Sequence, residues 1–278
     1  MAFTGMAPYL LLLPPTPLSF PFRESWISIP LLPIPELLAN PIPSIVPGYN
    51  FSSLSDIKPF LEPTAAGPST SWAFRIAEKL NCHVIVGYPE QAVGEGRYNS
   101  AVLVSPTGDV IQNYRKSFLF TTDEKWAKEG PGFWAGEVGK LGKMAMGICM
   151  DLNPKNFTAP SDAYEFGHHV TKTASKLAVV PMAWLTHEEA STLSSHPNIP
   201  DADTLRYWIQ RMRPVYYQKG ETIFVTCNRT GIEEGVTFAG SSCVVGLGDA
   251  AAKVYGVLGR GKAGLLVVDT GKPGDEDR

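Results

Sequence analysis

Apolar residues recur at helical spacing in some segments and form short unbroken runs in others. These two patterns predict helices and strands that alternate along the chain. In 70–80, Trp72, Ile76 and Leu80 fall near one face of a helix that Thr70 or Ser71 would cap. Longer segments at 164–176 and 200–219 are also compatible with helices. Short apolar runs predict strands in CHVIVGYPE, at 101–104 and 110–114, and in KMAMGICMD, KLAVVPMAW, ETIFVTCNRTG, SSCVVGL and AGLLVVDT.

This alternation favours an α/β fold in which helices cover mixed sheets. The two strands at 101–104 and 110–114 flank a Pro-Thr-Gly-Asp turn and form a predicted hairpin. No internal repeat occurs, and neither G-x-G-x-x-G nor G-x-x-x-x-G-K-[ST] is present. The sequence therefore gives no indication of a nucleotide cofactor.

The first 48 residues differ in composition from the rest of the chain. They hold 11 of the 24 prolines and only three charged residues, a mixture that suits neither a helix nor a central strand. No basic residue precedes Arg23, and prolines follow the aliphatic run 10–13 at once, so neither a secretory signal nor a membrane helix is expected. We expect 1–48 to be disordered, the folded body to span 49–270, and 271–278 to be a tail.

Net charge, cysteine spacing and histidine positions indicate which ligands and which cellular location to expect. The net charge is -3 and no Lys/Arg cluster stands out, which argues against nucleic-acid binding. The four cysteines are far apart, which favours reduced thiols and a cytoplasmic location, with the nucleus and mitochondria as alternatives. His168, His169 and His187 lack a credible set of fellow ligands, so we predict no metal and no cofactor.

The segment GICMDLNP carries the strongest candidate for chemistry. Cys149 stands where an apolar strand gives way to a polar loop, a position from which a nucleophile projects at a sheet edge. Lys116 follows the predicted hairpin and, if it lies beside the thiol, would lower the thiol pKa and bind negative charge. Taken singly, Cys149 reads as a buried structural cysteine, Lys116 as solvated surface, and Glu129 of EKWAKEGPGF as a loop carboxylate.

The order and spacing of several motifs change this interpretation. YNSAVLVSPTGDVIQNYRKSFLF, E-G-P-G-F, GICMDLNP, PMAW, and NRTG followed by F-A-G-SS resemble the carbon-nitrogen hydrolase (nitrilase) superfamily. The resemblance covers residues 49 to about 270. It implies an α-β-β-α sandwich, pairing into homo-oligomers, and a Glu-Lys-Cys triad.

The resemblance also implies residue roles. Cys149 would be the nucleophile, Lys116 the electrostatic stabiliser, and Glu129 the second carboxylate that orients Lys116 and substrate. The Met150 backbone N–H would join Lys116 in binding the oxyanion. Met-Asp-Leu-Asn-Pro after the cysteine is similar to the fungal branch that deamidates N-terminal Asn or Gln of proteins, in the N-degron pathway. Asp151 and Asp123 are candidates for binding the substrate α-ammonium.

The family's base glutamate is the missing part. Its motif has the form Leu-Pro-Glu-Met-Ala-Phe-Thr-Gly-Tyr-Asn-Phe; here MAFTG stands at 1–5 and YNF at 49–51. We therefore expect 6–48 to be a translated retained intron, and the glutamate, with the first strand and helix, to be encoded upstream of Met1. Glu36 lies too far from Tyr49 to replace it. Transcript reads that never join Gly5 to Tyr49 would count against the intron.

Three functions are compatible with the sequence. The first is an amidase whose full triad is encoded in the gene but incomplete in this chain. The second is an inactive, nitrilase-like binding partner. The third is an amidase or carbamoylase of the same superfamily that acts on small amides.

Overall fold

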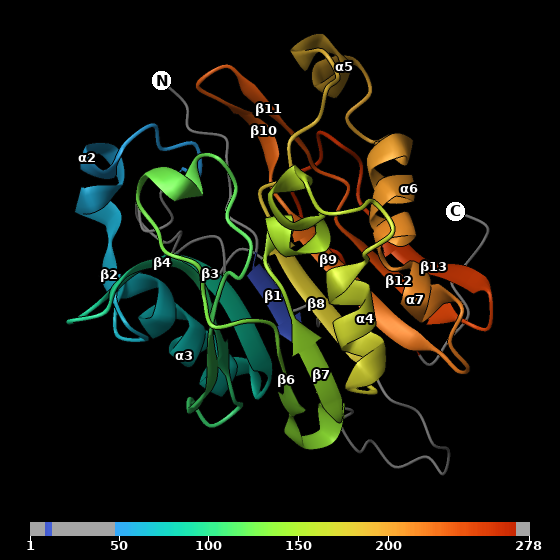
Figure 1. Cartoon of the computed structure of the whole chain (residues 1–278), viewed down its shortest axis with the longest axis horizontal. Coiled ribbons are helices and arrows are strands. Elements are labelled where there is room, and N and C mark those ends of the chain that lie inside the picture. The colour runs from blue at the N-terminus through green and yellow to red at the C-terminus, as the bar shows by residue number, and fades with distance from the viewer. Residues whose placement is uncertain (1–8, 13–47, 271–278) are drawn as a thin grey trace.

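Two β-sheets form the centre of the computed structural model, which describes residues 9–12 and 48–270 (Figure 1). The strands are β1 (Tyr9–Leu12), β2 (Glu62–Pro63), β3 (His83–Ala92), β4 (Gly96–Val104), β5 (Val110–Arg115), β6 (Trp134–Glu137), β7 (Lys143–Met146), β8 (Leu177–Met182), β9 (Thr222–Asn228), β10 (Thr230–Glu233), β11 (Val236–Ala239), β12 (Cys243–Gly248) and β13 (Ala251–Val257). The first sheet has the order β1-β3-β4-β5, with β2 beside β3, and the second has the order β13-β12-β9-β8-β7-β6. Strands β10 and β11 form a separate hairpin.

Helices of different lengths connect the strands of the two sheets. They are α2 (Leu54–Ile57), α3 (Pro68–Leu80), α4 (Glu165–Lys172), α5 (Ala190–Ser195), α6 (Ala202–Arg211) and α7 (Arg213–Tyr216), with the 3₁₀ turns η1 (Lys58–Phe60), η2 (Asp123–Lys125), η3 (Gly139–Leu141), η4 (Cys149–Leu152) and η5 (Lys155–Phe157). Helix α3 packs on the first sheet, while α4 and α7 lie against each other over the second (Figure 1). Within the described residues, no helix has both the length and the apolar character needed to cross a membrane.

The two sheets pack face to face because their strands alternate in side-chain direction. Val84 and Val86 of β3 belong to the core under α3, whereas Ile85 belongs to the core between the sheets. Strands β7, β8 and β9 run parallel, and β8 is buried along its whole length, as expected for a strand covered on both faces. This α-β-β-α arrangement confirms the predicted fold class.

Part of the segment 1–48 takes a place in the first sheet. Strand β1 pairs antiparallel with His83–Val86 at the edge of β3. We expected 1–48 to be disordered; most of that segment, including Glu36, lies outside the described residues. Strand β1 covers part of a sheet edge that would otherwise invite pairing with another chain.

Two predicted elements differ from the structure. The run at 263–270 forms no strand, although Val268 is buried against the main core; the last strand is instead β13, which precedes it. Asp249 and Ala250 both have positive φ and close a tight hairpin from β12 to β13. The predicted helix at 200–219 is divided into α6 and α7, because Pro214 cannot continue the hydrogen bonding of α6.

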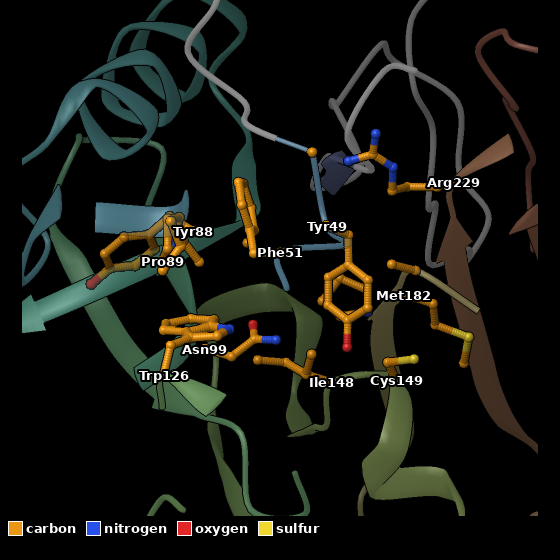
Figure 2. A pocket seen from close by; sticks show the side chains of 15 residues that line it. Tyr49, Phe51, Tyr88, Pro89, Asn99, Trp126, Ile148, Cys149, Met182 and Arg229 are labelled. Atoms are coloured by element: carbon orange, nitrogen blue, oxygen red, sulfur yellow. The ribbon is translucent and has the colours of Figure 1, made fainter. Parts of the chain in front are cut away.

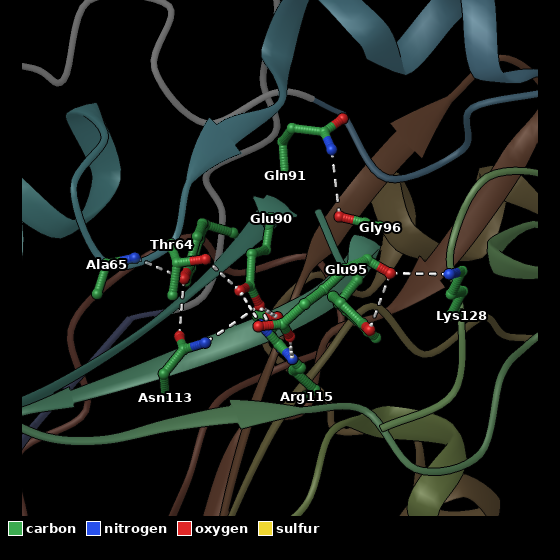
Figure 3. A network of polar contacts seen from close by, with 12 residues as sticks. Thr64, Ala65, Glu90, Gln91, Glu95, Gly96, Asn113, Arg115 and Lys128 are labelled. Carbon is green, nitrogen blue, oxygen red and sulfur yellow. Dashed lines mark hydrogen bonds and ion pairs between the residues drawn. The ribbon is translucent and has the colours of Figure 1, made fainter. Parts of the chain in front are cut away.

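A buried carboxylate joins the strands of the first sheet (Figure 3). Glu90 of β3 is fully buried, and the guanidinium of Arg115 at the end of β5 contacts both of its oxygens, at 2.8 and 3.1 Å. The hydroxyl groups of Thr64 and Ser100 donate to the same carboxylate at 2.6 and 2.5 Å, and the Asn113 amide donates at 3.1 Å. Glu90 thereby fixes the end of β5, immediately before Lys116.

We predict that Glu90→Ala lowers the free energy of unfolding by about 3 kcal/mol, because it leaves Arg115 and three other donors without their shared acceptor. Glu95→Ala is the matched control: Glu95 also contacts Arg115, at 2.5 Å, but its side chain is 60% exposed, so it should cost less than about 1 kcal/mol. Urea unfolding measures both. Equal losses for the two variants would contradict this account.

Candidate active site

A cavity of about 100 Å³ lies beside Cys149, and strands of both sheets contribute to its wall (Figure 2). Tyr88 of β3 and Asn99 of β4 come from the first sheet, and Met182 of β8 comes from the second. Tyr49 and Phe51, from the segment that precedes α2, complete one side. The site therefore lies where the two sheets and the N-terminal segment of the folded body meet.

Cys149 occupies a sharp turn from a strand into a 3₁₀ turn. Strand β7 ends at Met146, and η4 begins at Cys149, which has a φ of 43°. Positive φ is uncommon for a non-glycine residue and is held here by the surrounding packing. The side chain is buried but lines the cavity. This geometry agrees with the predicted elbow at a strand end.

Lys116 lies directly after β5 and is fully buried. Its backbone N–H donates to the Asn99 carbonyl at 2.8 Å, which extends the pairing between β4 and β5 by one residue. Its Nζ contacts Asp123 Oδ2 at 2.5 Å and the Tyr49 hydroxyl at 3.3 Å. Lys116 is therefore a buried cation with a buried carboxylate partner, and not the solvated surface lysine that was the alternative interpretation.

Burial and charge act in opposite directions on the pKa values of this group. Burial alone would lower the pKa of Lys116, but the charge and hydrogen bond of Asp123, together with the charges of Tyr49 and Cys149, outweigh it, so the pKa of Lys116 is raised and the ammonium form is retained. Burial raises the pKa of the Cys149 thiol, and the Lys116 ammonium partly offsets that rise. Lys116 thus stabilises the thiolate that a nucleophilic cysteine needs.

Asp123, at the start of η2, has both carboxylate oxygens engaged. In addition to Lys116, Oδ2 accepts from the Phe120 N–H at 3.0 Å and from the Tyr49 hydroxyl at 3.2 Å. Oδ1 accepts from the Asn99 amide at 3.1 Å. Asp123 is therefore the partner of Lys116, although the sequence predicted it as a residue that binds substrate.

Asp151, the other predicted substrate carboxylate, is also buried and fully engaged. Its Oδ1 accepts the backbone N–H groups of Ser117 and Phe118 at 3.0 and 2.8 Å. Its Oδ2 accepts the Ile148 N–H and the Tyr114 hydroxyl, both at 2.7 Å. Asp151 thus connects the segment after Lys116 to the turn that carries Cys149, which gives it a positioning role.

Glu129 lies at the surface. Its side chain is 44% exposed and pairs with Lys155 at 2.9 Å. The structure therefore does not bring Glu129 to Lys116, and Asp123 occupies the place that the sequence assigned to it. Met150 is the second residue of η4, and N–H groups in the first turn of a helix have no acceptor within that helix.

Several residues of the site were missed in the sequence. Tyr49 and Asn99 stand in the quoted YNF and YNS motifs, but nothing in the pattern of a single sequence indicates that both contact Asp123. Arg229 of the NRTG motif lines the cavity and pairs with Glu233 at 3.1 Å. Among the described residues, no group of three or more His, Cys, Asp or Glu is placed to hold a metal ion.

We predict that Lys116→Met slows alkylation of Cys149 by iodoacetamide about tenfold at pH 8. Losing the ammonium raises the thiol pKa further, and each unit of pKa reduces the thiolate fraction about tenfold. Peptide mass spectrometry reports the rate at this cysteine alone. Lys155→Met, which removes a surface lysine, should leave the rate unchanged; equal effects of the two variants would contradict the assigned role of Lys116.

A second prediction concerns the pH dependence of stability. Burial raises the pKa of Asp151 to about 6, although the hydrogen bonds that its carboxylate accepts act to lower that pKa. Between about pH 4 and pH 6 the native carboxyl holds a proton that the unfolded chain has released, so the unfolding free energy falls as pH rises. Relative to Asp151→Asn, the parent should lose about 3 kcal/mol from pH 4 to pH 7. Parallel pH profiles in urea unfolding would contradict this.

Comparisons with known proteins agree with this geometry. A family model described as carbon-nitrogen hydrolase matches residues 40–188, so the match begins within the segment expected to be an intron. A protein N-terminal amidase of Schizosaccharomyces pombe is 33% identical over 261 residues, covering 88% of each chain. A protein N-terminal amidase of Saccharomyces cerevisiae is 38% identical over 156 residues, covering 50% of this chain and 34% of that protein.

The fold is also shared with a solved structure. The crystal structure of an N-terminal amidase with an Asn-Glu-Ala peptide superposes with a TM-score of 0.74 over 80% of this chain and 86% of that chain, at 23% identity. At that identity the likeness establishes the fold alone. Together with the family model and the relative from Schizosaccharomyces pombe, it leads to one conclusion: the chain belongs to the carbon-nitrogen hydrolase family.

Proposed function

We propose that this protein hydrolyses the side-chain amide of an N-terminal Asn or Gln, converting it to Asp or Glu. The observation that carries the proposal is the buried Lys116 ammonium, held by Asp123, whose charge acts on the Cys149 thiol at the cavity. A thiolate beside a fixed cation is suited to attack a carbonyl group. The names of the two yeast relatives supply the terminal amide, and the solved N-terminal amidases with Asn-Glu-Ala and Gln-Val peptides supply Asn and Gln.

The reaction would proceed through a thioester. Cys149 Sγ forms a bond to the carboxamide carbon, and the carbonyl oxygen takes the negative charge beside Lys116 Nζ and the Met150 N–H. The C–N bond then breaks, and ammonia leaves with the proton that the thiol released. Water attacks the thioester, which restores the thiol and releases the carboxylic acid. Asp123 takes no part in bond making and holds Lys116 in place.

The general base is the part of this proposal that rests on the family resemblance. Among residues 9–12 and 48–270, the carboxylate that contacts Lys116 belongs to Asp123, which that contact already engages. We propose that the base is a glutamate, as the family resemblance implies. The N-degron role and pairing into homo-oligomers also remain predictions.

A second candidate follows from the same observation. It is a nitrilase-like binding partner, in which the site binds an amide without hydrolysing it. The third candidate, an amidase or carbamoylase for small amides, requires the same thiol and cation and differs only in substrate.

Ammonia release from Asn-leading and Gln-leading peptides separates these candidates. We expect a variant in which Leu-Pro-Glu is placed before Met1 and Gly5 is joined to Tyr49 to release ammonia. The printed chain should be slower by about 100-fold or more, because general-base assistance contributes on that scale. Cys149→Ala in this variant is the control and should abolish release.

Two outcomes would contradict the proposal. Activity on small amides or carbamoyl amino acids, with none on peptides, would favour the third candidate. No ammonia release from any of these substrates by the variant with Leu-Pro-Glu before Met1 would favour the binding partner.

A further inference from the structure

The cavity wall opposite Cys149 combines a neutral hydrogen-bond acceptor with aromatic rings. An enzyme that acts only on a terminal residue must bind its α-ammonium, and the sequence predicted a carboxylate for this task. The structure commits the carboxylates of this region to other partners. Asp123 and Asp151 are engaged as described, and Glu233 accepts the N–H groups of Tyr49 and Asn50 and pairs with Arg229.

The orientation of Asn99 follows from its contact with Asp123. A carboxylate paired with Lys116 only accepts hydrogen bonds, so the Asn99 NH₂ group must face Asp123, as the 3.1 Å contact shows. The amide oxygen therefore faces the other way, on a residue that lines the cavity (Figure 2). The contacts of the described residues include no donor to this oxygen, so it is available to a ligand.

Aromatic side chains line the same part of the cavity. Phe51, Tyr88 and Trp126 lie on the side of Asn99, across the cavity from Cys149 (Figure 2). The Tyr88 hydroxyl is bonded elsewhere, donating to Asn113 at 2.7 Å and accepting from the Ala65 N–H at 2.9 Å, so its ring alone is offered to the cavity. Faces of aromatic rings attract cations, and tryptophan does so most strongly.

We propose that Asn99 Oδ1 and the rings of Trp126 and Phe51 form the subsite that binds the α-ammonium of the substrate's first residue. This rests on the proposed function and specifies how a terminal amide is distinguished from an internal one. A neutral subsite has a physical advantage here, because an extra carboxylate would compete with Asp123 for Lys116. The ammonium would be bound by one hydrogen bond and by cation–π attraction.

Binding is measured with Cys149→Ala in the full chain, so that turnover does not interfere. Isothermal titration compares Asn-Gly-Gly with its desamino counterpart, succinamoyl-Gly-Gly, which keeps the carboxamide and lacks the amine. We expect the amine peptide to bind at least about tenfold more tightly at pH 6.5, the scale of a desolvated cation–π contact. The preference should disappear above pH about 8, where the α-amine loses its proton.

Variants in the same background locate the subsite. Trp126→Leu should weaken binding of the amine peptide several-fold and leave that of the desamino peptide unchanged. Trp126→Phe, which keeps an aromatic face, should retain most of the preference. Phe157→Leu is the matched control, because Phe157 is an exposed aromatic residue outside the cavity wall. Unchanged binding of the desamino peptide also shows that each variant is folded.

The outcomes distinguish this proposal from the proposed function. Equal binding of the two peptides, binding of neither, or equal weakening of both by Trp126→Leu would overturn the subsite. Ammonia release without discrimination for the amine would overturn the subsite and leave the amidase intact. Selective binding of the amine peptide by a product that releases no ammonia would support the subsite and contradict the amidase.

Discussion

The buried ion pair between Lys116 and Asp123 is the interaction on which the site depends. Removing two charges from water costs several kcal/mol for each ion, and close contact repays this cost only when further hydrogen bonds satisfy both groups. Here the Phe120 N–H, the Tyr49 hydroxyl and the Asn99 amide all donate to Asp123. Lys116 can therefore remain charged while fully buried, and its field acts on Cys149, which is also buried.

Buried polar contacts also hold together the distant segments that carry Lys116 and Cys149. Lys116 follows β5 in the first sheet, and Cys149 follows β7 in the second, so the packing of the two sheets sets their separation. Asp151 connects the two places directly, since its carboxylate binds N–H groups after Lys116 and before Cys149. Glu90 secures the end of β5 from the opposite side. The hydrogen bonds of Asp151 and Glu90 thus hold in place the strand ends next to which Lys116 and Cys149 lie.

Local patterns were sufficient for much of the fold. The helix at 70–80, the hairpin before Lys116 and the apolar strands around Cys149 carry strong periodicity or β-branched runs, and the structure has all of them. The last strand was misplaced because β13 has an exposed, alanine-rich sequence, whereas the more apolar run after it packs on the core without a strand partner. Which of the two segments forms the last strand depends on which one pairs with a neighbouring strand, and local composition does not reveal this.

The candidate site likewise contains residues that could be predicted from the sequence and residues that could not. Cys149 and Lys116 each read as an ordinary structural or surface residue when taken singly, but both could be identified from the ordered motifs that resemble the carbon-nitrogen hydrolase superfamily. The partners of Lys116 could not, because Asp123 belongs to a short turn that only the folded chain brings back to it. Glu129 was chosen from a loop motif, and its contact with Lys155 at the surface depends on how that loop is folded. Whether a carboxylate serves the active site is thus decided by its three-dimensional surroundings.

The central claim is that Cys149 attacks the carboxamide while the ion pair stabilises the charge that develops. Its most direct test is acid quenching of a reaction between the variant with Leu-Pro-Glu before Met1 and an Asn-leading peptide, followed by mass spectrometry of the protein. We expect an adduct on Cys149 with the mass of the peptide less one molecule of ammonia. Ammonia release with no adduct on Cys149 at any quench time, or with an adduct on another residue, would contradict the account.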